Sequence, residues 1–330
     1  MVHPAASTSA SVAATATVAG ADLARADELI LARSLAAVGR RRALGMHFYG
    51  HFLGIADGWA GDGRSRLSLE GEPHDVGSAD VSGVAIATLA DLALGAAIRS
   101  RLDKGTRLGT VTFTVQHPAA PVQGPLVAEG QALFVAERRG TAQCVISSGD
   151  RPVAQAQGWF SALPAPDGRT LALLPWERDE PPEIATPAQD DLDADEARAV
   201  SAARAAGRRA ALGGTAVSHE LLPFEWEAPT EGGIRGVLPI GPELANRVGH
   251  LQGGVVYGAA AVAAARAIGL PPSCVMDGHY QFLRPADGAY LTADATVTRR
   301  GRSVIFAESR LSVDGTLVGL GLFTARPSTD

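Results

Sequence analysis

The chain has 330 residues, which is the length of about two domains. With 46% hydrophobic and 19% charged residues, it has the composition of a globular protein that buries a sizeable core. The net charge of −6 argues against a nucleic-acid or anionic-membrane partner, because both select a basic surface. Cys144 and Cys274 lie far apart in the sequence, which excludes a disulfide scaffold and a structural zinc site.

Residues 1–21 are rich in Ala, Ser and Thr, and we expect them to form a disordered tail. They have neither the basic start nor the apolar middle of a signal peptide. The longest apolar runs, 84–98 and 253–265, fall short of the roughly 18 residues that a membrane span needs. We therefore expect a cytoplasmic protein with no membrane partner.

An internal repeat is the main organising feature of the sequence. Residues 39–45 read GRRRALG, and residues 207–213 read GRRAALG. Each motif closes an Ala- and Arg-rich run, 22–42 or 190–210, that predicts a helix. The acids at the start of the second run complement the helix dipole, as do the arginines at its end.

The repeat continues through the rest of both halves. Two Gly-led apolar segments, 82–98 and 252–268, predict the central helix of each half. Alternating strands follow each helix, and they have matching Pro-Ala corners and Arg-Arg-Gly hairpin tips. These paired features are at 110–119 and 277–286, and at 138–140 and 299–301.

The simplest architecture is α+β, with two copies of one unit. Residues 22–165 would form the first copy and residues 190–330 the second. Residues 166–189, between them, are rich in proline and acids, which is typical of a linker. In each copy an antiparallel sheet wrapped on the long central helix would bury the apolar face of both.

Gly253 and Gly254 open the second central helix, where the first N–H groups have no intrahelical partner and the helix dipole is positive. Glycine lets a ligand oxygen approach the backbone closely. A carbonyl that becomes an oxyanion could bind at this helix start, and a simple tight turn is the alternative.

Asp91 is the only charged residue in the first central helix segment, 82–98. A carboxylate is costly to bury unless it is hydrogen-bonded. Its helical neighbours Ala87, Leu94 and Ile98 are apolar, so Asp91 does not lie on a polar stripe. This pattern favours a functional carboxylate over one that merely points to water.

The spacing Asn246-x-x-Gly249-x-x-Gln252-Gly253-Gly254 ahead of an apolar helix resembles the hotdog-fold acyl-CoA thioesterases. The nearest branch is the one named for phenylacetate degradation (PaaI-like). The segment IATLADLALG around Asp91 is similar to the acid-bearing helix of the same family. The resemblance covers residues 45–165 and 215–327, and it implies a tandem, or double, hotdog.

Each half departs from the family pattern in a complementary way. The second half keeps Asn246 and the glycines, but Gln252 stands at the usual His position and Ala261 at the acid position. The first half keeps Asp91, but Ser82 replaces the His. Val76, Gly83 and Val84 stand at the other motif positions of that half.

In dimers of this family the acid and the Asn/Gly elements come from different subunits. The resemblance therefore implies one composite site, in which the first half gives Asp91 and the second half gives Asn246, Gln252 and Gly253. We expect Asp91 within one water-bridged span of the Gly253 amide. The opposite combination, Val76, Ser82 and Ala261, would be a site without an acid.

The chemistry that the resemblance implies is thioester hydrolysis. The N–H of Gly253 would hold the oxyanion, and Asp91 would act as a general base or as a nucleophile. Asn246 would orient the water or the carbonyl, and Gln252 could donate a hydrogen bond but could not carry a proton. The remaining substrate-binding candidates are Gly254, His250, Thr88, Arg284 and Arg300.

For some of these candidates a structural alternative remains. His250 could turn into the site or make local loop contacts. Arg284 and Arg300 could clamp the phosphates of coenzyme A or simply solvate the surface. The Ala-rich stretch 259–265 could allow close helix packing or leave room for an acyl chain.

No metal or cofactor is expected. His47, His51 and His74 lack metal-ligand spacing and should be structural or solvent-facing. Two other functions remain open: a non-catalytic acyl-CoA binding or regulatory hotdog protein, and a hotdog enoyl-CoA hydratase or dehydratase. The latter chemistry uses an Asn-Pro-x-His segment that is absent here, and no Gly-x-Ser-x-Gly elbow indicates a serine hydrolase. The expected partners are an acyl-CoA substrate and further copies of the chain, as a homo-oligomer of double-hotdog units.

Overall fold

The computed structural model describes most of the chain, with backbone alone for residues 8–21. The described residues are 8–45, 47–55, 58–73, 75–117, 121–164, 171, 173–180, 182–231 and 233–327. The Met46, His74 and 165–170 positions lie outside them, so the expectation for His74 and for the start of the linker is not addressed.

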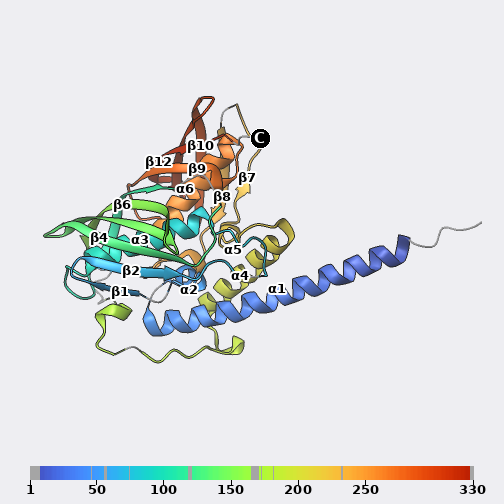
Figure 1. Ribbon diagram of the computed structural model, residues 1–330, viewed down its shortest axis with the longest axis horizontal. Helices are drawn as coiled ribbons and strands as arrows, with labels where there is room; N and C mark the ends of the chain where they lie inside the picture. The colour runs from blue at the N-terminus through green and yellow to red at the C-terminus, as the bar shows by residue number, and fades with distance from the viewer. Residues whose placement is uncertain are drawn as a thin grey trace, which may run out of the picture.

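One antiparallel sheet dominates the described part of the chain (Figure 1). The strand order is β1-β2-β4-β5-β6-β3-β9-β12-β11-β10-β8-β7. Counted outward from the central strands β3 and β9, corresponding strands of the two halves follow in the same order. The first-half strands are β1 (Gly58–Gly61), β2 (Arg64–Leu69), β3 (Arg107–Gln116), β4 (Leu126–Ala136), β5 (Arg139–Ser148) and β6 (Arg151–Leu163). The second-half strands are β7 (Glu225–Trp226), β8 (Gly233–Pro239), β9 (Val275–Phe282), β10 (Tyr290–Arg300), β11 (Ile305–Val313) and β12 (Thr316–Ala325).

The halves meet at strands β3 and β9. These strands pair antiparallel from Thr112↔Gln281 to Gln116↔Asp277. The Thr114 hydroxyl adds a 2.8 Å hydrogen bond to Nδ1 of His279 across the join. The expected continuous sheet of two hotdog units, with its α+β class, is therefore confirmed.

Each half of the sheet covers one central helix, α3 (Gly83–Arg99) or α6 (Gly253–Ile268), close to the expected bounds. Ser82 caps α3 by accepting from the Ala85 N–H, and Gln252 caps α6 by accepting from the Val255 N–H. Both helices are buried along almost all of their length because Ala, Val, Leu and Gly leave no polar face to solvate.

The first helices of the two halves, α1 (Thr8–Leu44) and α4 (Ala194–Gly213), lie antiparallel at one side of the molecule. The carboxylate of Asp27 pairs with Arg204 and Arg208, and Glu196 pairs with Arg42. The short helices α2 (Phe48–Phe52) and α5 (Val217–Glu220) follow them. Ser218 of α5 bonds Ser82 at the start of α3, the central helix of the other half, and the Tyr49 hydroxyl of α2 donates to the Ser218 carbonyl.

The prediction that residues 1–21 form a disordered tail is wrong for residues 8–21, the part that the structure describes. Helix α1 begins at Thr8, and its first turns extend away from the rest of the protein (Figure 1). Alanine has the highest helix propensity, so the Ala-rich composition that suggested disorder also continues a helix that packing fixes further on. Residues 1–7 lie outside the described residues.

The Pro- and acid-rich connection is more than a spacer. Leu171, Leu174 and the short 3₁₀ helix η2 (Pro175–Glu177) pack against the body, with Leu174 2% exposed. The chain then passes η3 (Gln189–Asp191) before entering α4. Two further 3₁₀ turns, η4 (Pro242–Leu244) and η5 (Pro272–Cys274), flank α6.

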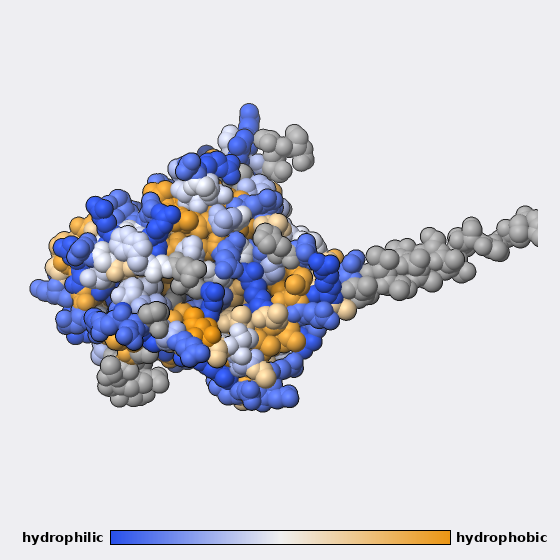
Figure 2. All heavy atoms as spheres, turned by 60° about the horizontal axis from the view of Figure 1, so that its bottom comes forward, coloured by the Kyte–Doolittle hydropathy of each residue, from blue (hydrophilic) through white to orange (hydrophobic). Residues whose placement is uncertain are grey.

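The surface is mixed in character. On the face shown in Figure 2, polar side chains form most of the surface, and apolar side chains gather in patches between them. No helix among the described residues is both long enough and apolar enough to cross a membrane.

Candidate active site between the halves

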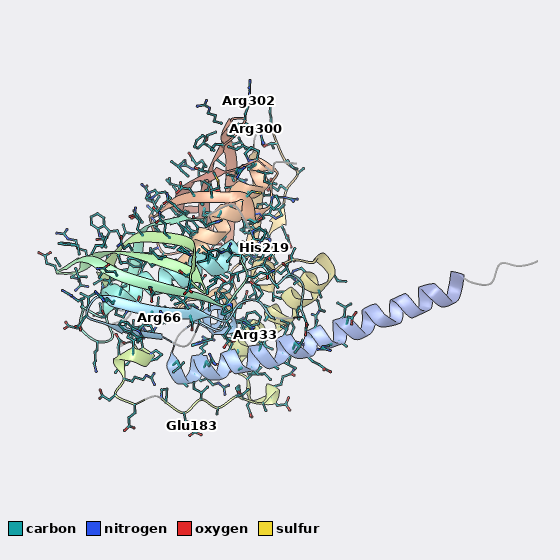
Figure 3. The ribbon with its side chains drawn as sticks, viewed as in Figure 1. Arg33, Arg66, Glu183, His219, Arg300 and Arg302 are labelled. Atoms are coloured by element: carbon teal, nitrogen blue, oxygen red, sulfur yellow. The ribbon has the colours of Figure 1, made fainter. Side chains whose placement is uncertain are left out.

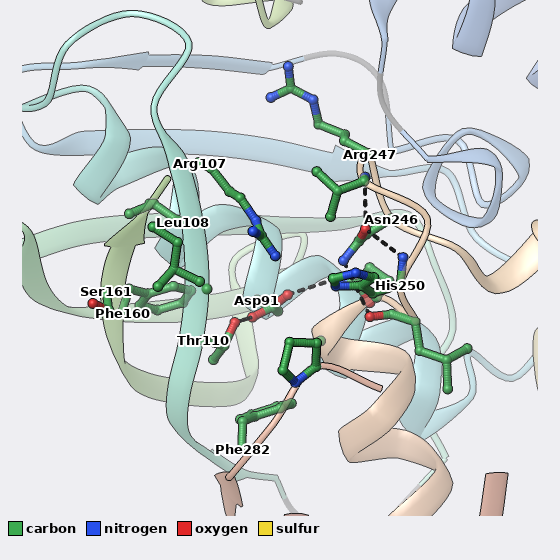
Figure 4. Close-up of a pocket in the computed structure, with 18 of the residues that line it drawn as sticks. Asp91, Arg107, Leu108, Thr110, Phe160, Ser161, Asn246, Arg247, His250 and Phe282 are labelled. Carbon is green, nitrogen blue, oxygen red and sulfur yellow. Dashed lines mark hydrogen bonds between the residues drawn. The ribbon is translucent and has the colours of Figure 1, made fainter. Parts of the chain in front are cut away.

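The N-terminal end of α6 meets the middle of α3, and Asp91 lies at this contact. Its carboxylate is only 8% exposed. Asp91 Oδ1 accepts a 2.8 Å hydrogen bond from the Thr110 hydroxyl of β3, and Oδ2 accepts one of 2.7 Å from Nε2 of Gln252 (Figure 4). The N–H of Gly254 is a further donor to this carboxylate. The first half therefore supplies the acid, and the second half supplies part of its hydrogen-bond shell.

The two glycines at the start of α6 allow this close approach. A Cβ atom at Gly253 would lie 2.8 Å from Asp91 Oδ2, and one at Gly254 would lie 2.4 Å from the Cα atom of Thr88. Only glycine fits both positions without moving α3 and α6 apart. The expectation that Asp91 lies within one water-bridged span of the Gly253 backbone agrees with this geometry.

Gln252 is buried between the helices, and each atom of its amide has a defined partner. Oε1 accepts from the Val255 N–H at 2.9 Å and from the Thr88 hydroxyl at 3.5 Å. These donors fix Nε2 toward Asp91. Thr88 itself is fully buried behind Gln252, so the expectation that Thr88 contacts substrate is corrected: it orients Gln252.

Burial raises the pKa of Asp91 from 3.8 to about 6. The hydrogen bonds from Thr110 and Gly254 oppose this increase because they stabilise the charged form. The carboxylate is thus ionised at neutral pH yet far more basic than an exposed aspartate.

A cavity of about 400 Å³ opens in front of Asp91, Thr110 and Gly253. Its walls combine apolar side chains of α3, β3, β6 and the connecting segment with the loop that precedes α6. Four arginines line the cavity: Arg99, Arg107, Arg247 and Arg284. Among the described residues, Asp91 is the one acidic side chain that lines it. The cavity therefore suits a ligand with both apolar and anionic parts.

The Gly253 N–H has no hydrogen-bond partner within the described part of the chain. Gly253 lines this cavity at the positive end of α6. An oxyanion is the group that such a donor would stabilise.

Asn246 and His250 both line the cavity but differ from expectation in their contacts. The Asn246 Oδ1 accepts from the N–H groups of Val248 and His250, and Nδ2 donates to the Leu251 carbonyl. Asn246 therefore holds its own loop, instead of pointing a free amide at a ligand. His250 Nε2 lies 3.6 Å from Asp287 Oδ2, and burial lowers its pKa.

The two arginines predicted to bind substrate separate in the structure. Arg284 is exposed at the rim of the cavity and donates to the Leu317 carbonyl. Arg300 lies at the far end of β10 and donates to the carbonyl of Ile268, at the end of α6 (Figure 3). The prediction for Arg300 is therefore wrong, because strand β10 ends away from the cavity.

Sequence reasoning missed Thr110 and the connecting segment. Thr110 was visible only as the start of an alternating strand, and nothing local indicates that its hydroxyl meets Asp91. Leu171, Leu174 and Trp176 come from a segment whose composition predicted a linker. Apolar residues among the prolines were the available signal for packing.

The opposite combination of the halves lacks the acid on its helix, as expected for Ala261. A Cβ atom at Gly83 would have no other atom within 4 Å. The Ser82 hydroxyl instead bonds Ser218 Oγ at 2.7 Å, and Ser218 bonds the buried carboxylate of Glu72. The expected absence of any acid is therefore corrected: Glu72 is present, but α5 covers it.

Among the described residues, no group of three or more His, Cys, Asp or Glu side chains could hold a metal ion. His47 and His51 are both buried, so neither is solvent-facing.

Comparisons with known proteins match both halves. Residues 79–155 match the family described as Thioesterase superfamily, and residues 242–326 match that described as Acyl-CoA thioesterase N-terminal domain. No curated protein matches the chain significantly.

Solved structures resemble the whole double unit. A protein from Novosphingobium aromaticivorans named as a thioesterase has 18% identity and a TM-score of 0.51, over 81% of this chain and 96% of its own. A protein from Lactobacillus plantarum named as an oleoyl thioesterase has 9% identity and a TM-score of 0.50, over 83% and 97%. These likenesses support the double-hotdog fold. Each half thus matches a thioesterase family, and together the two matches indicate a tandem hotdog thioester hydrolase of the acyl-CoA thioesterase type.

Proposed function

We propose that this thioesterase hydrolyses acyl-CoA at one composite site, with Asp91 as the general base and the Gly253 N–H as the oxyanion donor. The observation that carries the proposal is the position of Asp91. Its carboxylate is held by Thr110 from its own half and by Gln252 from the other, at the positive end of α6. An acyl-CoA binding protein without catalysis would have no use for a basic, buried carboxylate at that point.

The hydrogen bonds of Asp91 favour a general base over a nucleophile. A carboxylate has about four lone-pair positions, and Thr110, Gln252 and Gly254 occupy three of them. The one that remains can accept a proton from water. Attack by an Asp91 oxygen would require it to leave donors that the helix start and Gln252 hold rigidly in place.

The reaction then balances as follows. A water molecule gives its proton to Asp91 while its oxygen bonds to the thioester carbon. Charge develops on the carbonyl oxygen beside the Gly253 N–H, which stabilises it. The intermediate collapses, the carbon–sulfur bond breaks, and the proton on Asp91 passes to the departing thiolate. The products are a carboxylic acid and coenzyme A.

Three supporting roles complete the proposal. Thr110 and Gln252 are positioning residues that hold the carboxylate, and Asn246 fixes the loop that presents Gly253. Arg284, exposed at the rim, would meet the phosphates of coenzyme A. The phenylacetate-type branch, the homo-oligomer and the location in the cell stay predictions.

The pH dependence of kcat/KM tests the base. Because the ionised form of Asp91 is the active one, kcat/KM should rise about tenfold per pH unit below about pH 6 and level off above it, at the pKa of Asp91. Initial rates with saturating and limiting acyl-CoA across this range give the profile. A flat profile through pH 6 would contradict Asp91 as the titrating group.

Replacing Thr110 by Val should shift the same profile. The Thr110 hydroxyl lowers the pKa of Asp91, so its loss should move the midpoint above pH 6 and reduce the rate in that region by about tenfold. Thr110→Ser is the matched control because it keeps the hydroxyl, and its midpoint should stay near that of the wild type. Equal midpoints in all three proteins would show that Thr110 does not position the base.

Single-turnover hydrolysis in heavy-oxygen water separates the two mechanisms. A general base puts the water oxygen into the product acid in the first turnover. A nucleophilic Asp91 would expel the thiolate and form a mixed anhydride; water that then attacks the Asp91 carbonyl of this anhydride leaves the label in Asp91 and an unlabelled Asp91 oxygen in the product acid. A panel of aromatic, short and long acyl-CoA esters, assayed by thiol release, identifies the substrate for this measurement. Absence of thiol release from the whole panel would refute hydrolysis.

A further inference from the structure

Helix α3 lines the cavity with one of its faces. The lining residues of this helix are Asp91, Leu92, Gly95 and Arg99. Their spacing places them on a single stripe of the helix. Gly95 lies one turn beyond Asp91, about 6 Å along the helix axis. The cavity wall therefore continues from the proposed base to a position that has no side chain.

Packing does not require glycine at position 95. Glycine inside a helix is destabilising relative to alanine, so an interior glycine needs a reason. At Gly258, the other glycine in the interior of a central helix, the reason is steric, because a Cβ atom would lie 2.7 Å from Cγ1 of Val84. Beyond the surrounding backbone of α3, the nearest described atom to a Cβ at Gly95 would be Cε1 of Phe160, at 3.7 Å. This is an ordinary contact distance, so the fold would accept alanine there.

The second half has a side chain at the equivalent position. Counted from the glycine that opens each central helix, Gly95 of α3 corresponds to Ala265 of α6, and Asp91 corresponds to Ala261. Ala265 is 1% exposed, so alanine packs well at this point of a central helix. The half with the acid lacks the side chain, and the half without the acid has it. The missing side chain thus goes with the proposed reaction and not with the architecture of the helix.

The side chains around Gly95 are apolar. Phe160 lies against it, and Leu92 and Leu108 line the same cavity from α3 and β3. In the view of Figure 4, Leu108 and Phe160 lie together on one side of Asp91. Such walls suit a hydrocarbon chain, whereas the amides of the pantetheine arm of coenzyme A would lose hydrogen bonds to water there.

The arginines on this side of the cavity already have partners. Nε of Arg99 donates to the Thr106 carbonyl at 3.1 Å. Burial lowers the pKa of Arg99, and the nearby carboxylates of Glu177 and Asp91 raise it. Arg107 likewise donates to a backbone carbonyl, at 3.1 Å. The wall therefore does not require a charged or polar acyl group.

We propose that Gly95 determines which acyl groups this protein accepts, because its missing side chain leaves room for a hydrocarbon chain that runs along α3 past Asp91. The inference rests on the proposed hydrolysis at Asp91 for the position of the thioester. A side chain on a helix leans toward the N-terminus of the helix, so any side chain at position 95 would lean back toward Asp91. It would occupy the space that the acyl chain needs.

The spacing of Asp91 and Gly95 sets the chain length at which the effect begins. A fully extended chain advances about 1.2 Å per bond, one third of the roughly 3.6 Å spanned by a residue of three bonds. About five bonds beyond the carbonyl therefore cover the 6 Å or so from Asp91 to Gly95. An octanoyl chain extends past Gly95, whereas an acetyl group ends beside Asp91. The substrate class is then an acyl-CoA with more than about five carbons beyond the carbonyl.

The test compares octanoyl-CoA with acetyl-CoA in the wild type, Gly95→Ala and Gly95→Leu. We expect the wild type to prefer octanoyl-CoA in kcat/KM. Gly95→Ala should lower kcat/KM for octanoyl-CoA by about 10-fold, the effect of one methyl group in a hydrophobic pocket, mainly through KM. Gly95→Leu should lower it further, and acetyl-CoA should change by less than about threefold in Gly95→Ala.

Thermal unfolding gives a second measurement that does not depend on activity. Gly95→Ala should raise the Tm by about 2 °C, because alanine is the better helix former and fits at this position. Ala265→Gly is the matched control, since it makes the reverse change at the equivalent position. It should lower the Tm by about 2 °C and leave the ratio of the two substrates unchanged.

Three outcomes would overturn the proposal. A wild type that prefers acetyl-CoA would show that no long chain occupies the cavity. Equal losses for both substrates in Gly95→Ala would assign the space to the pantetheine arm, which both substrates share. A lower Tm in Gly95→Ala would show that the fold itself needs the glycine.

Binding of non-hydrolysable analogues separates this inference from the proposed function. The ketone analogues of both substrates, in which a methylene replaces the sulfur, are titrated into the wild type and Gly95→Ala. A Kd that weakens only for the octanoyl analogue, without hydrolysis of any thioester, would refute the proposed function and support the role of Gly95. Hydrolysis of both thioesters with the same ratio in all variants would refute the role of Gly95 and leave the proposed function intact.

Discussion

Asp91→Asn is expected to lower kcat for the best acyl-CoA by at least about 100-fold, because general bases contribute about 10²–10⁴-fold. The substitution keeps the shape of the side chain and removes its charge and its basic lone pair. KM should change little, since Asp91 acts on the reacting centre and not on the coenzyme A handle. Steady-state kinetics with the preferred substrate measures both parameters.

The same variant should be more stable than the wild type at neutral pH. The folded protein raises the pKa of Asp91 from 3.8 to about 6, so ionised Asp91 costs on the order of 3 kcal/mol of folding free energy above about pH 6. This cost disappears as the pH falls below about 4, where Asp91 is protonated in both states. The difference in unfolding free energy between variant and wild type should therefore grow from about pH 4 to pH 6.

Two results would contradict this account of Asp91. Undiminished turnover in Asp91→Asn would remove the acid from the mechanism, and unchanged stability at neutral pH would show that the buried charge is fully compensated. Ala261→Asp in the Asp91→Asn background is the control for the composite site. It should not restore activity, because Ser82 and Val76 replace the motif residues on that side.

Gly254→Ala should have the largest effect on folding. The added Cβ would lie 2.4 Å from the Cα and 2.6 Å from the N of Thr88, and these backbone atoms cannot turn aside as a side chain can. We expect a loss of about 3 kcal/mol in unfolding free energy, at the upper end for overpacking. Activity should fall about 100-fold, because α6 carries Gln252 and Gly253 away from Asp91. Chemical denaturation and thiol release measure the two effects.

Gly83→Ala is the matched control at the start of the other central helix. No atom lies within 4 Å of its added Cβ, so stability should stay within about 0.5 kcal/mol of the wild type. A Gly254→Ala protein that matched this control would show that the two helices can separate without cost.

The fold could be predicted from the sequence because the same pattern of helices and strands occurs in both halves. The Gly-led helices at 82–98 and 252–268 each gain support from the other, and the expected bounds differ from the observed ones by a residue at most. The N-terminal segment, which has no counterpart in the second half, was predicted wrongly. Residues 8–21 continue α1, since a run of alanines carries no pattern that separates a helix from a tail.

The candidate site was predictable only where residues fall in one motif. Asp91, Gln252 and Gly253 could be assigned because family spacing marks them. Thr110 could not, since its hydroxyl reaches Asp91 through the pairing of a strand with a helix. The cavity wall also combines residues that are distant in sequence, such as Arg99 and Trp176, and no local pattern predicts that arrangement.

The pairing of strands β3 and β9 also determines whether the proposed site stays assembled when the protein is diluted. A hotdog site assembled from two separate chains dissolves when the protein is diluted below its dimer dissociation constant. Here the acid and the helix start that completes its site are joined by a shared sheet and one backbone. The local concentration of one half around the other is fixed by the chain and not by the number of molecules in solution. Each molecule therefore carries both parts of the proposed site, however scarce the protein is.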